Sequence, residues 1–236
     1  MGFFSSIGSA ISNIGSAIGN AVSSIGSALS SFSTGIAPVI GGVLEKLAPA
    51  AKAVCIIANA LLQSFGILKP NEKIDEMGDR ALQAAENGLT IDDFEDFDSY
   101  MEALRNFEPD PVKSENYSLA EKIVSGLGVG TVGMEEKFDS EPGSLDSVWL
   151  LPLANPEYFN TDKLQNILSS GCFNGDAFAY LEKRLTGGES RSFEKAMEVG
   201  ADGKVMNADE RSELYQALEN AQDNWSTMMD KLDGNN

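Results

Sequence analysis

Residues 7–28 read IGSAISNIGSAIGNAVSSIGSA, and this stretch decides how the front of the chain folds. Its two halves, 7–17 and 18–28, are identical at eight of eleven positions. Large apolar residues recur at steps of three or four, which is the periodicity of an α-helix and not of a strand. An eleven-residue period favours a straight or slightly right-handed helical bundle. The sequence therefore predicts one long N-terminal helix, with apolar spacing that continues to Ile36.

Two kinds of residue on this helix are expected to make contacts with a membrane or with other helices. The apolar ridge consists of Phe3, Phe4, Ile7, Ile11, Ile14, Ile18, Val22, Ile25, Leu29 and Phe32. The glycines expected to bring helix backbones close together are Gly8, Gly15, Gly19 and Gly26. Each glycine inside a helix costs about 1 kcal/mol relative to alanine. Because no charge is present to form ion pairs, we expect this helix to need a partner surface.

Charge is distributed very unevenly along the 236 residues, whose net charge is −19. Residues 1–68 carry only Glu45, Lys46 and Lys52, whereas residues 69–236 carry 35 acidic and 15 basic side chains. An acidic surface argues against binding nucleic acid or anionic lipid through charge. The composition predicts two domains, an apolar helical hairpin over 1–68 for membrane contact or assembly, and an acidic soluble α-helical domain over 69–236.

A second uncharged stretch, residues 53–68, follows the repeat. Pro38, Gly41 and Gly42 are expected to end or kink the first helix. The three charges of the region would then lie near the tip of a hairpin. Sixteen helical residues span about 24 Å, which is less than the roughly 30 Å of a bilayer's hydrocarbon core. The stretch is therefore compatible both with a membrane segment and with a buried core helix.

The acidic part reads as short helices separated by turns. Thr90 is expected to cap a helix with Phe94, Phe97, Met101 and Leu104 on one face. A helix near 118–125 is expected to end at the glycine-rich residues 126–133. Further helices are predicted to start at Asn160 or Thr161, at Asn174, at Ser190 and near Ala208, with stops at Gly171, Gly187–Gly188 and Gly200. No strand pattern is visible, and the predicted class is all-α.

No motif in the chain indicates catalysis, a metal or a cofactor. Histidine is absent, which removes the usual general base and metal ligand. Cys55 and Cys172 form no CxxC and are interpreted as separate free thiols. Residues 200–210 resemble a calcium loop but lack one expected ligand, and Asn207 with Glu210 reads equally as a helix cap. The glycine-rich residues 126–133 lack the GK[ST] ending of a phosphate-binding loop. The acidic residues of 92–98 are interpreted as a solvated helix face and not as catalytic carboxylates. We therefore predict a protein that is not an enzyme.

The opening MGFFSSIGSAI resembles the N-termini of membrane-active proteins carried in virions, namely the DNA pilot proteins of small phages and the ejection proteins of tailed phages. The resemblance covers residues 1–36 and is one of composition. It implies a structural protein of a phage or related injection particle, present as a homo-oligomer or particle component. Such a protein moves from the virion to the target-cell membrane and helps delivery across the envelope.

Two other functions remain open on the sequence alone. The apolar front could pack inside a larger complex such as a tail hub, which would make the protein a scaffold. The hairpin could also serve translocation in a secreted effector or pore-forming toxin.

Overall fold

The computed structural model describes residues 12–173 and 175–232. Within this part of the chain the fold is all-α, as predicted, and the one pairing of extended residues is an isolated bridge between Val199 and Val205. The chain divides into two compact units, unit 1 over 1–146 and unit 2 over 147–236. Each unit is described by itself below.

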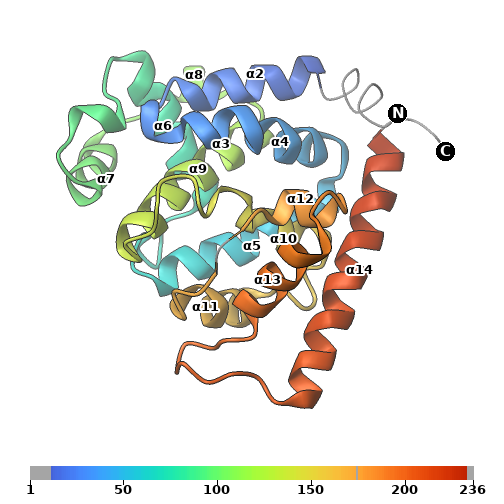
Figure 1. The fold of residues 1–236 in the computed structure, drawn as a ribbon. Helices are drawn as coiled ribbons and strands as arrows, with labels where there is room; N and C mark the ends of the chain where they lie inside the picture. The colour runs from blue at the N-terminus through green and yellow to red at the C-terminus, as the bar shows by residue number, and fades with distance from the viewer. Residues whose placement is uncertain (1–11, 174, 233–236) are drawn as a thin grey trace. The chain divides into compact units, whose positions relative to one another are not determined.

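Unit 1 contains the repeat and a long central helix (Figure 1). Its helical elements are α2 (Ser12–Ser23), η1 (Ser27–Leu29), α3 (Ser30–Gly35), α4 (Ala37–Lys46), α5 (Ala48–Ser64), α6 (Ile74–Glu86), η2 (Ile91–Asp93), α7 (Phe97–Asn106), α8 (Pro111–Ser114) and α9 (Leu119–Lys137).

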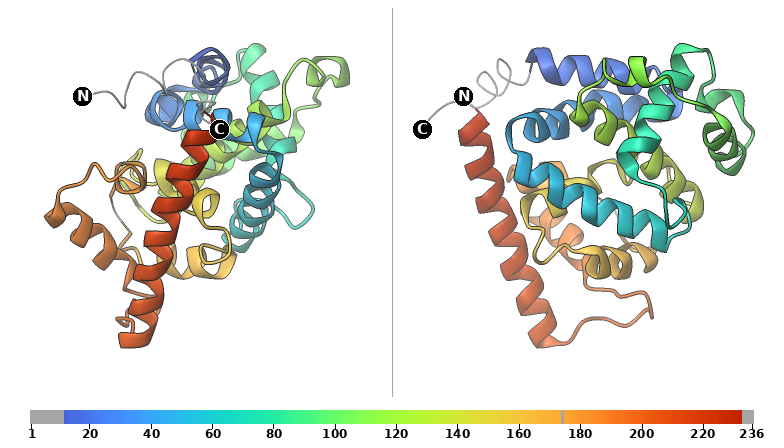
Figure 2. Two further views of the ribbon diagram at one scale, coloured as in Figure 1. Left: turned by 90° about the vertical axis from the view of Figure 1, so that its right-hand side faces the viewer. Right: turned by 180° about the vertical axis from the view of Figure 1, so that it is seen from behind.

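The repeat does not form one continuous helix, so this part of the prediction is wrong. Helix α2 ends at Ser23, and Gly26 takes φ +152° and ψ 168°, a conformation open in practice only to glycine. The backbone N–H of Ile91 donates to the carbonyl of Ile25 at 3.0 Å, which fixes this turn. The chain then returns along α2 as η1, α3 and α4, and the left view of Figure 2 looks nearly along α2 and α4.

Helix α4 runs through Gly41 and Gly42, where the sequence predicted a break. Pro38 lies in the first turn of α4, where the missing N–H leaves no hydrogen bond unmade. The bend occurs earlier, at Ile36, and amounts to 54° between Ser27–Gly35 and Ala37–Lys46. Gly41 is retained inside a helix because α2 lies against it: a Cβ there would be 2.4 Å from Ile18 Cδ1.

Helix α9 contains the glycine-rich residues 126–133 in its interior, so the predicted stop at Gly126 is also wrong. Ser118 and Glu121 form a capping box at its start. Its glycines then face different neighbours. A Cβ on Gly126 would lie 2.0 Å from the Ile74 carbonyl oxygen of α6, and one on Gly130 would lie 2.6 Å from Leu62 of α5. A helix that is buried all round needs small residues wherever a neighbour crosses closely.

Because α2, α4, α5, α6 and α7 all pack on α9, residues 1–68 do not form a separate domain in this fold. The division between the units falls after Asp146, not after Leu68 as the composition suggested. The uncharged helices find their apolar partner in α9, which belongs to the acidic part of the chain. The distribution of charge along the sequence therefore reflects the surface of the two segments. It does not predict which helices share a core.

Unit 2 consists of η3 (Asp146–Trp149), which begins one residue before it, and of α10 (Leu150–Ala154), α11 (Thr161–Ser169), α12 (Ala177–Leu181), α13 (Gly187–Met197) and α14 (Ala208–Leu232). Asn160 caps α11 by accepting from the Lys163 N–H, as predicted. Thr186 caps α13, which therefore begins at Gly187 rather than Ser190 and includes the predicted stop. Asn174 lies outside the described residues, and Asp176 caps α12.

Thr90 also behaves differently from the prediction. It forms a capping box with Asp93, but the element it caps is the short η2 and not the following α-helix. Helix α7 begins later, at Phe97, where Asp96 accepts from the Ser99 N–H at 2.7 Å. Phe97, Met101 and Leu104 still share a buried face, as their spacing predicted.

Candidate functional site: the charge-free helices of unit 1

The charge-free segment, residues 12–44, forms α2, η1, α3 and most of α4. The predicted apolar ridge lies along it and faces inward. Its buried members, each at most 1% exposed, are Ile18, Val22, Ile25, Leu29 and Phe32. Ile14 is 45% exposed, and Phe3, Phe4, Ile7 and Ile11 lie outside the described residues. The described ridge is therefore covered by helices of its own unit.

Two of the four predicted packing glycines, Gly19 and Gly26, lie at close contacts inside unit 1. A Cβ on Gly19 would be 2.6 Å from the Ser33 carbonyl oxygen and 3.2 Å from Pro38 Cγ. A Cβ on Gly26 would be 2.4 Å from Ile91 Cγ2. Gly15 is buried in α2, and Gly8 lies outside the described residues. Glycine thus allows close approach between helices of one molecule here.

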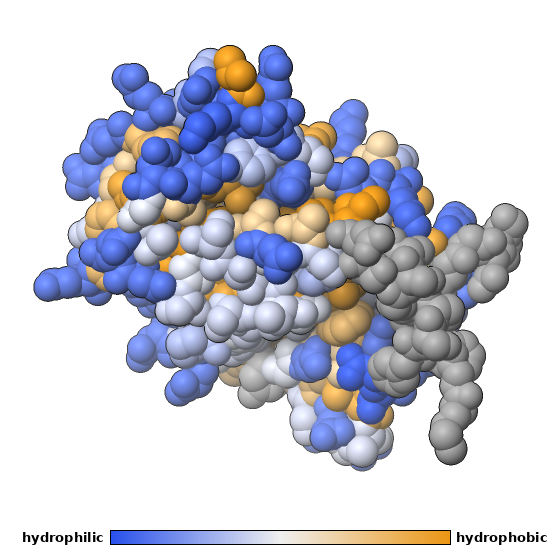
Figure 3. Space-filling view, turned by 90° about the horizontal axis from the view of Figure 1, so that it is seen from above, coloured by the Kyte–Doolittle hydropathy of each residue, from blue (hydrophilic) through white to orange (hydrophobic). Residues whose placement is uncertain are grey.

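The outward side of the charge-free segment forms a neutral face, pale in Figure 3. Its exposed residues are Ile14, Ser16, Ala17, Asn20, Ser23, Ser24, Ser27, Ala28, Ser30, Ser31, Thr34 and Gly35. Surface helices of soluble proteins usually carry charged residues on the outward side. These helices have none on either side, although the whole chain carries −19.

Several hydroxyl groups of the neutral face are satisfied by their own helix. Ser23 Oγ donates to the Asn20 carbonyl at 2.8 Å, and Ser24 Oγ donates to the Ala21 carbonyl at 2.7 Å. Thr34 Oγ1 donates to the Ser30 carbonyl at 2.8 Å. A hydroxyl bonded in this way does not need water, which lowers the cost of moving the helix into an apolar environment.

Two aspartates hold the neutral face to the acidic part of unit 1. The Asp92 carboxylate accepts from the Ser27 N–H at 2.7 Å and from Ser27 Oγ at 2.8 Å. The buried Asp146 carboxylate accepts from the Ser31 hydroxyl. Burial raises the pKa of Asp146 above its usual value, although the bond from Ser31 acts in the opposite direction. With the hydrogen bond from the Ile91 N–H to the Ile25 carbonyl, these contacts join the charge-free segment to the acidic part through polar groups.

A second buried carboxylate lies beside Asp146. Glu135 of α9 accepts from the Leu145 N–H at 2.9 Å. Burial raises the pKa of Glu135, bonds from the Leu145 and Gly143 N–H groups lower it, and the charge of Asp146 raises it further. The pKa values of both Glu135 and Asp146 are raised overall. Keeping these two carboxylates charged at neutral pH therefore costs the folded state free energy.

The three charged residues of the N-terminal region lie at the end of α4 and near the start of α5. Glu45, Lys46 and Lys52 are all exposed, and Leu47 alone separates the two helices. A pocket of about 210 Å³ opens beside this connection. Its lining residues are Leu44, Glu45, Ala51, Leu119, Ala120 and Ile123.

The described residues offer no arrangement for metal or nucleophilic chemistry. No group of three or more Cys, Asp or Glu side chains among them is placed to hold a metal ion. In the calcium-like stretch, Lys204 pairs with Asp202, and Asn207 caps α14 with Glu210. Burial, with the charge of Asp75, raises the pKa of Cys55 to about 11, so this thiol stays protonated at neutral pH.

One polar cluster was not visible in the sequence because its members are far apart in it. Ser114 Oγ donates to Asp79 at 2.6 Å, and Lys122 Nζ donates to Ser114 Oγ at 2.7 Å. Lys122 Nζ also lies 3.9 Å from the Asp79 carboxylate. The cluster ties α8 and α9 to α6.

None of the described helices is by itself long and apolar enough to cross a bilayer. The bent pair Ser27–Gly35 and Ala37–Lys46 meets the requirement jointly, by length and composition.

No family model, curated protein or solved structure matches this chain.

Proposed function

We propose that this protein is a non-enzymatic, membrane-active protein whose charge-free segment leaves the core of unit 1 and enters a bilayer. One observation carries the proposal: residues 12–44 bear no charge on either their buried or their exposed side. Each large aliphatic residue contributes about −0.3 to −0.6 kcal/mol to insertion, whereas a central lysine or aspartate costs about 2.5 to 3.5 kcal/mol. A single charge would therefore cancel the contribution of several ridge residues.

The packing of unit 1 supports the same proposal. The ridge packs against α9, and small residues lie where the helices cross. Because residues 12–44 carry no charged side chain, separating them from α9 breaks no ion pair of their own. The polar contacts that hold the segment to the acidic part include Ser27 with Asp92, Ser31 with Asp146, and the Ile91 N–H with the Ile25 carbonyl. The helices that leave carry hydroxyls already bonded to their own backbone. The acidic remainder is expected to stay in water because its charge opposes burial.

The setting that we propose is a phage or related injection particle, in which several copies act together during delivery across a cell envelope. The N-terminal resemblance to pilot and ejection proteins supports this setting. Assembly of several copies is expected because the serines of one charge-free segment weaken insertion of a single copy, and neighbouring helices supply hydrogen-bond partners.

A disulfide that fastens the charge-free segment to unit 1 tests the proposal. A Cβ at Gly143 would lie 3.4 Å from Ser31 Cβ, close to the Cβ separations of 3.5–4.5 Å found in disulfides. The double variant Ser31→Cys/Gly143→Cys is made with Cys55→Ala and Cys172→Ser, so that no other thiol remains. We expect the oxidised protein to leave dye-loaded vesicles intact and the reduced protein to release the dye.

Two single variants control this experiment. Ser31→Cys alone loses the hydroxyl bond to Asp146, so it should release dye at least as fast as the parent, but at the same rate in both redox states. Gly143→Cys alone measures the cost of a side chain at φ +84°, which is of order 1 kcal/mol. Equal dye release from the oxidised and reduced double variant, or none from the parent protein, would contradict the proposal.

A scaffold function is the second candidate, and the neutral face favours it. Small, uncharged side chains allow a partner helix to approach closely without desolvating any charge. In that case the ridge stays buried in unit 1 and the neutral face packs inside a larger complex. Extraction from membranes by sodium carbonate and failure to float with vesicles would support the scaffold over insertion. A pore-forming toxin would share the insertion step, and cytotoxicity of the purified chain would distinguish it.

A further inference from the structure

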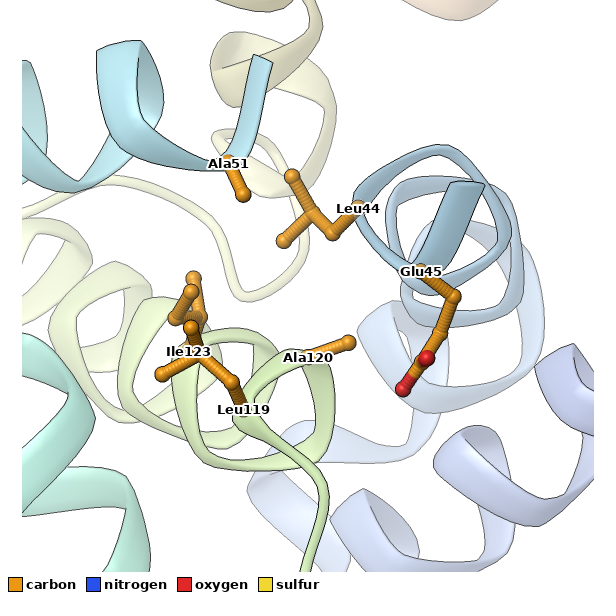
Figure 4. A pocket seen from close by; sticks show the side chains of 6 residues that line it. All are labelled: Leu44, Glu45, Ala51, Leu119, Ala120 and Ile123. Atoms are coloured by element: carbon orange, nitrogen blue, oxygen red, sulfur yellow. The ribbon is translucent and has the colours of Figure 1, made fainter. Parts of the chain in front are cut away.

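The connection between α4 and α5 differs from the rest of the charge-free helices. We define the tip as residues 44–52 together with Leu119, Ala120 and Ile123 of α9, which line the same pocket (Figure 4). Lys46 and Lys52, the two basic residues among 1–68, are exposed at either end of the stretch Leu47–Ala51. The tip therefore combines two cations with apolar side chains.

The apolar part of the tip is partly open to solvent. Leu119 is 60% exposed at the start of α9, and Ala48 and Pro49 are exposed at the start of α5. Five of the six residues that line the pocket are aliphatic, and Glu45 is the sixth, with its carboxylate at the side of the pocket in Figure 4. Exposed aliphatic residues flanked by lysines are typical of surfaces that sit at a membrane interface.

We infer that the tip is the surface through which closed unit 1 first binds a bilayer containing anionic lipid. The inference rests on the proposed function, because it names the first contact that precedes insertion. Lys46 and Lys52 would bind lipid phosphates, while Pro49 and Leu119 enter the boundary between headgroups and acyl chains. The pocket walls would receive an apolar group from the lipid.

Charge complementarity decides between this partner and others. Although the chain carries −19, the tip itself carries two positive charges and one negative charge, Glu45. Charges separated by more than about 8 Å are largely screened at physiological ionic strength, so the groups nearest the tip dominate the contact. The nearest carboxylate of α9, Glu121, is engaged by the Ser118 N–H at 2.7 Å.

The inference requires binding without opening, which separates it from the insertion step. The experiment therefore uses the full chain locked by the Ser31–Gly143 disulfide. Locked protein is floated with vesicles of phosphatidylcholine alone and with an equimolar mixture of phosphatidylcholine and phosphatidylglycerol. We expect it to float with the mixed vesicles and not with phosphatidylcholine alone, and to release no dye.

Variants of the tip then identify the contact. A lysine near an anionic surface contributes about fivefold to binding, so Lys46→Gln/Lys52→Gln should weaken flotation by about twentyfold or more. Leu119→Ser should weaken it severalfold, and Lys46→Arg/Lys52→Arg should preserve it. The matched control, Lys195→Gln/Lys204→Gln, makes the same charge change at exposed positions of unit 2 and should have less than a twofold effect.

Three results would overturn the inference. They are equal losses from the tip and control variants, equal flotation with both kinds of vesicle, and no flotation of the locked protein. Failure of insertion would look different, since locked and reduced protein would then both float and neither would release dye. If reduced protein released dye regardless of the tip substitutions, insertion would stand and the tip would not be its first contact.

Discussion

Gly41 of α4 lies directly against Ile18 of α2, so that a Cβ at position 41 would be 2.4 Å from Ile18 Cδ1 and 3.3 Å from Ile18 Cβ. Both residues are buried inside unit 1. The contact shows that Ile18 of the repeat packs against a glycine of the same molecule. It also makes the pairing of α2 with α4 testable by substitution.

Gly41→Ala should destabilise unit 1 by about 1 to 3 kcal/mol, because the added methyl overfills a packed contact. Ile18→Val removes the Cδ1 atom that the new methyl meets. The double variant should therefore lose less stability than the sum of the two single variants. Urea unfolding of the four proteins forms a double-mutant cycle. Additive losses would mean that Ile18 and Gly41 are not in contact.

The glycines of the chain should fall into two classes of very different cost. A methyl at Gly126 would lie 2.0 Å from the Ile74 carbonyl oxygen, where only movement of a backbone could relieve it. Gly126→Ala should cost more than about 3 kcal/mol, or prevent folding. Gly35→Ala, the matched control, adds its methyl to open space at the end of α3 and should be neutral or stabilising by up to about 1 kcal/mol. Urea midpoints of the two variants check this, and similar losses would show that α6 does not cross α9 at Gly126.

The sequence predicted the all-α class and the helical spacing of the ridge, because period and capping are local properties of the chain. Asn160 and Asn207 were placed correctly for this reason. The break at Gly26 and the continuation of α9 through Gly126–Gly133 could not be predicted in the same way. Glycine ends a helix that is exposed but is required in one that other helices cross, and only the tertiary contacts decide which applies.

The candidate site shows the same limit. That residues 12–44 carry no charge is evident from the sequence, but which side of them faces water is not. The tip needed Leu119 and Ile123, which lie about seventy residues after Lys46 in the chain and adjoin it only in the fold. Asp92 likewise belongs to a run of acids that the sequence predicts to be a solvated face, and only the fold shows that it bonds Ser27.

Asp92→Asn should loosen the turn between α2 and α3. A carboxylate that accepts from both the N–H and the hydroxyl of Ser27 contributes about 1.5 to 3 kcal/mol, and an amide replaces only part of this. Unit 1 should lose about 1 kcal/mol, and dye release from vesicles should become faster because the charge-free segment is held less firmly. Glu95→Gln, an equal charge change at a nearby exposed position, should alter neither the urea midpoint nor the release rate. Slower release from Asp92→Asn would argue against this turn as a fastening.

The stability of unit 1 should depend on pH through Glu135 and Asp146. The pKa of each is raised in the folded protein, chiefly by burial. A carboxyl group whose pKa is higher when folded than when unfolded binds its proton more tightly in the folded state. It therefore destabilises the fold above the folded pKa, and this penalty is removed as the pH falls toward the unfolded pKa near 4.

Glu135→Gln should remove its share of that penalty and raise the neutral-pH stability toward the value that the parent shows in mild acid. The glutamine carbonyl can still accept from the Leu145 N–H, so the turn after α9 is kept. Urea midpoints measured from neutral pH down to about pH 5 should rise in the parent and stay flatter in the variant. Carboxylates with lowered pKa values, such as Glu72 bonded to Arg105, stabilise the fold only while they are charged, so their protonation destabilises it at lower pH. The pH range of the measurement should therefore end above the point at which these groups bind protons. If the variant were less stable than the parent at neutral pH, Glu135 would be a stabilising anion and the buried pair would not carry the penalty described.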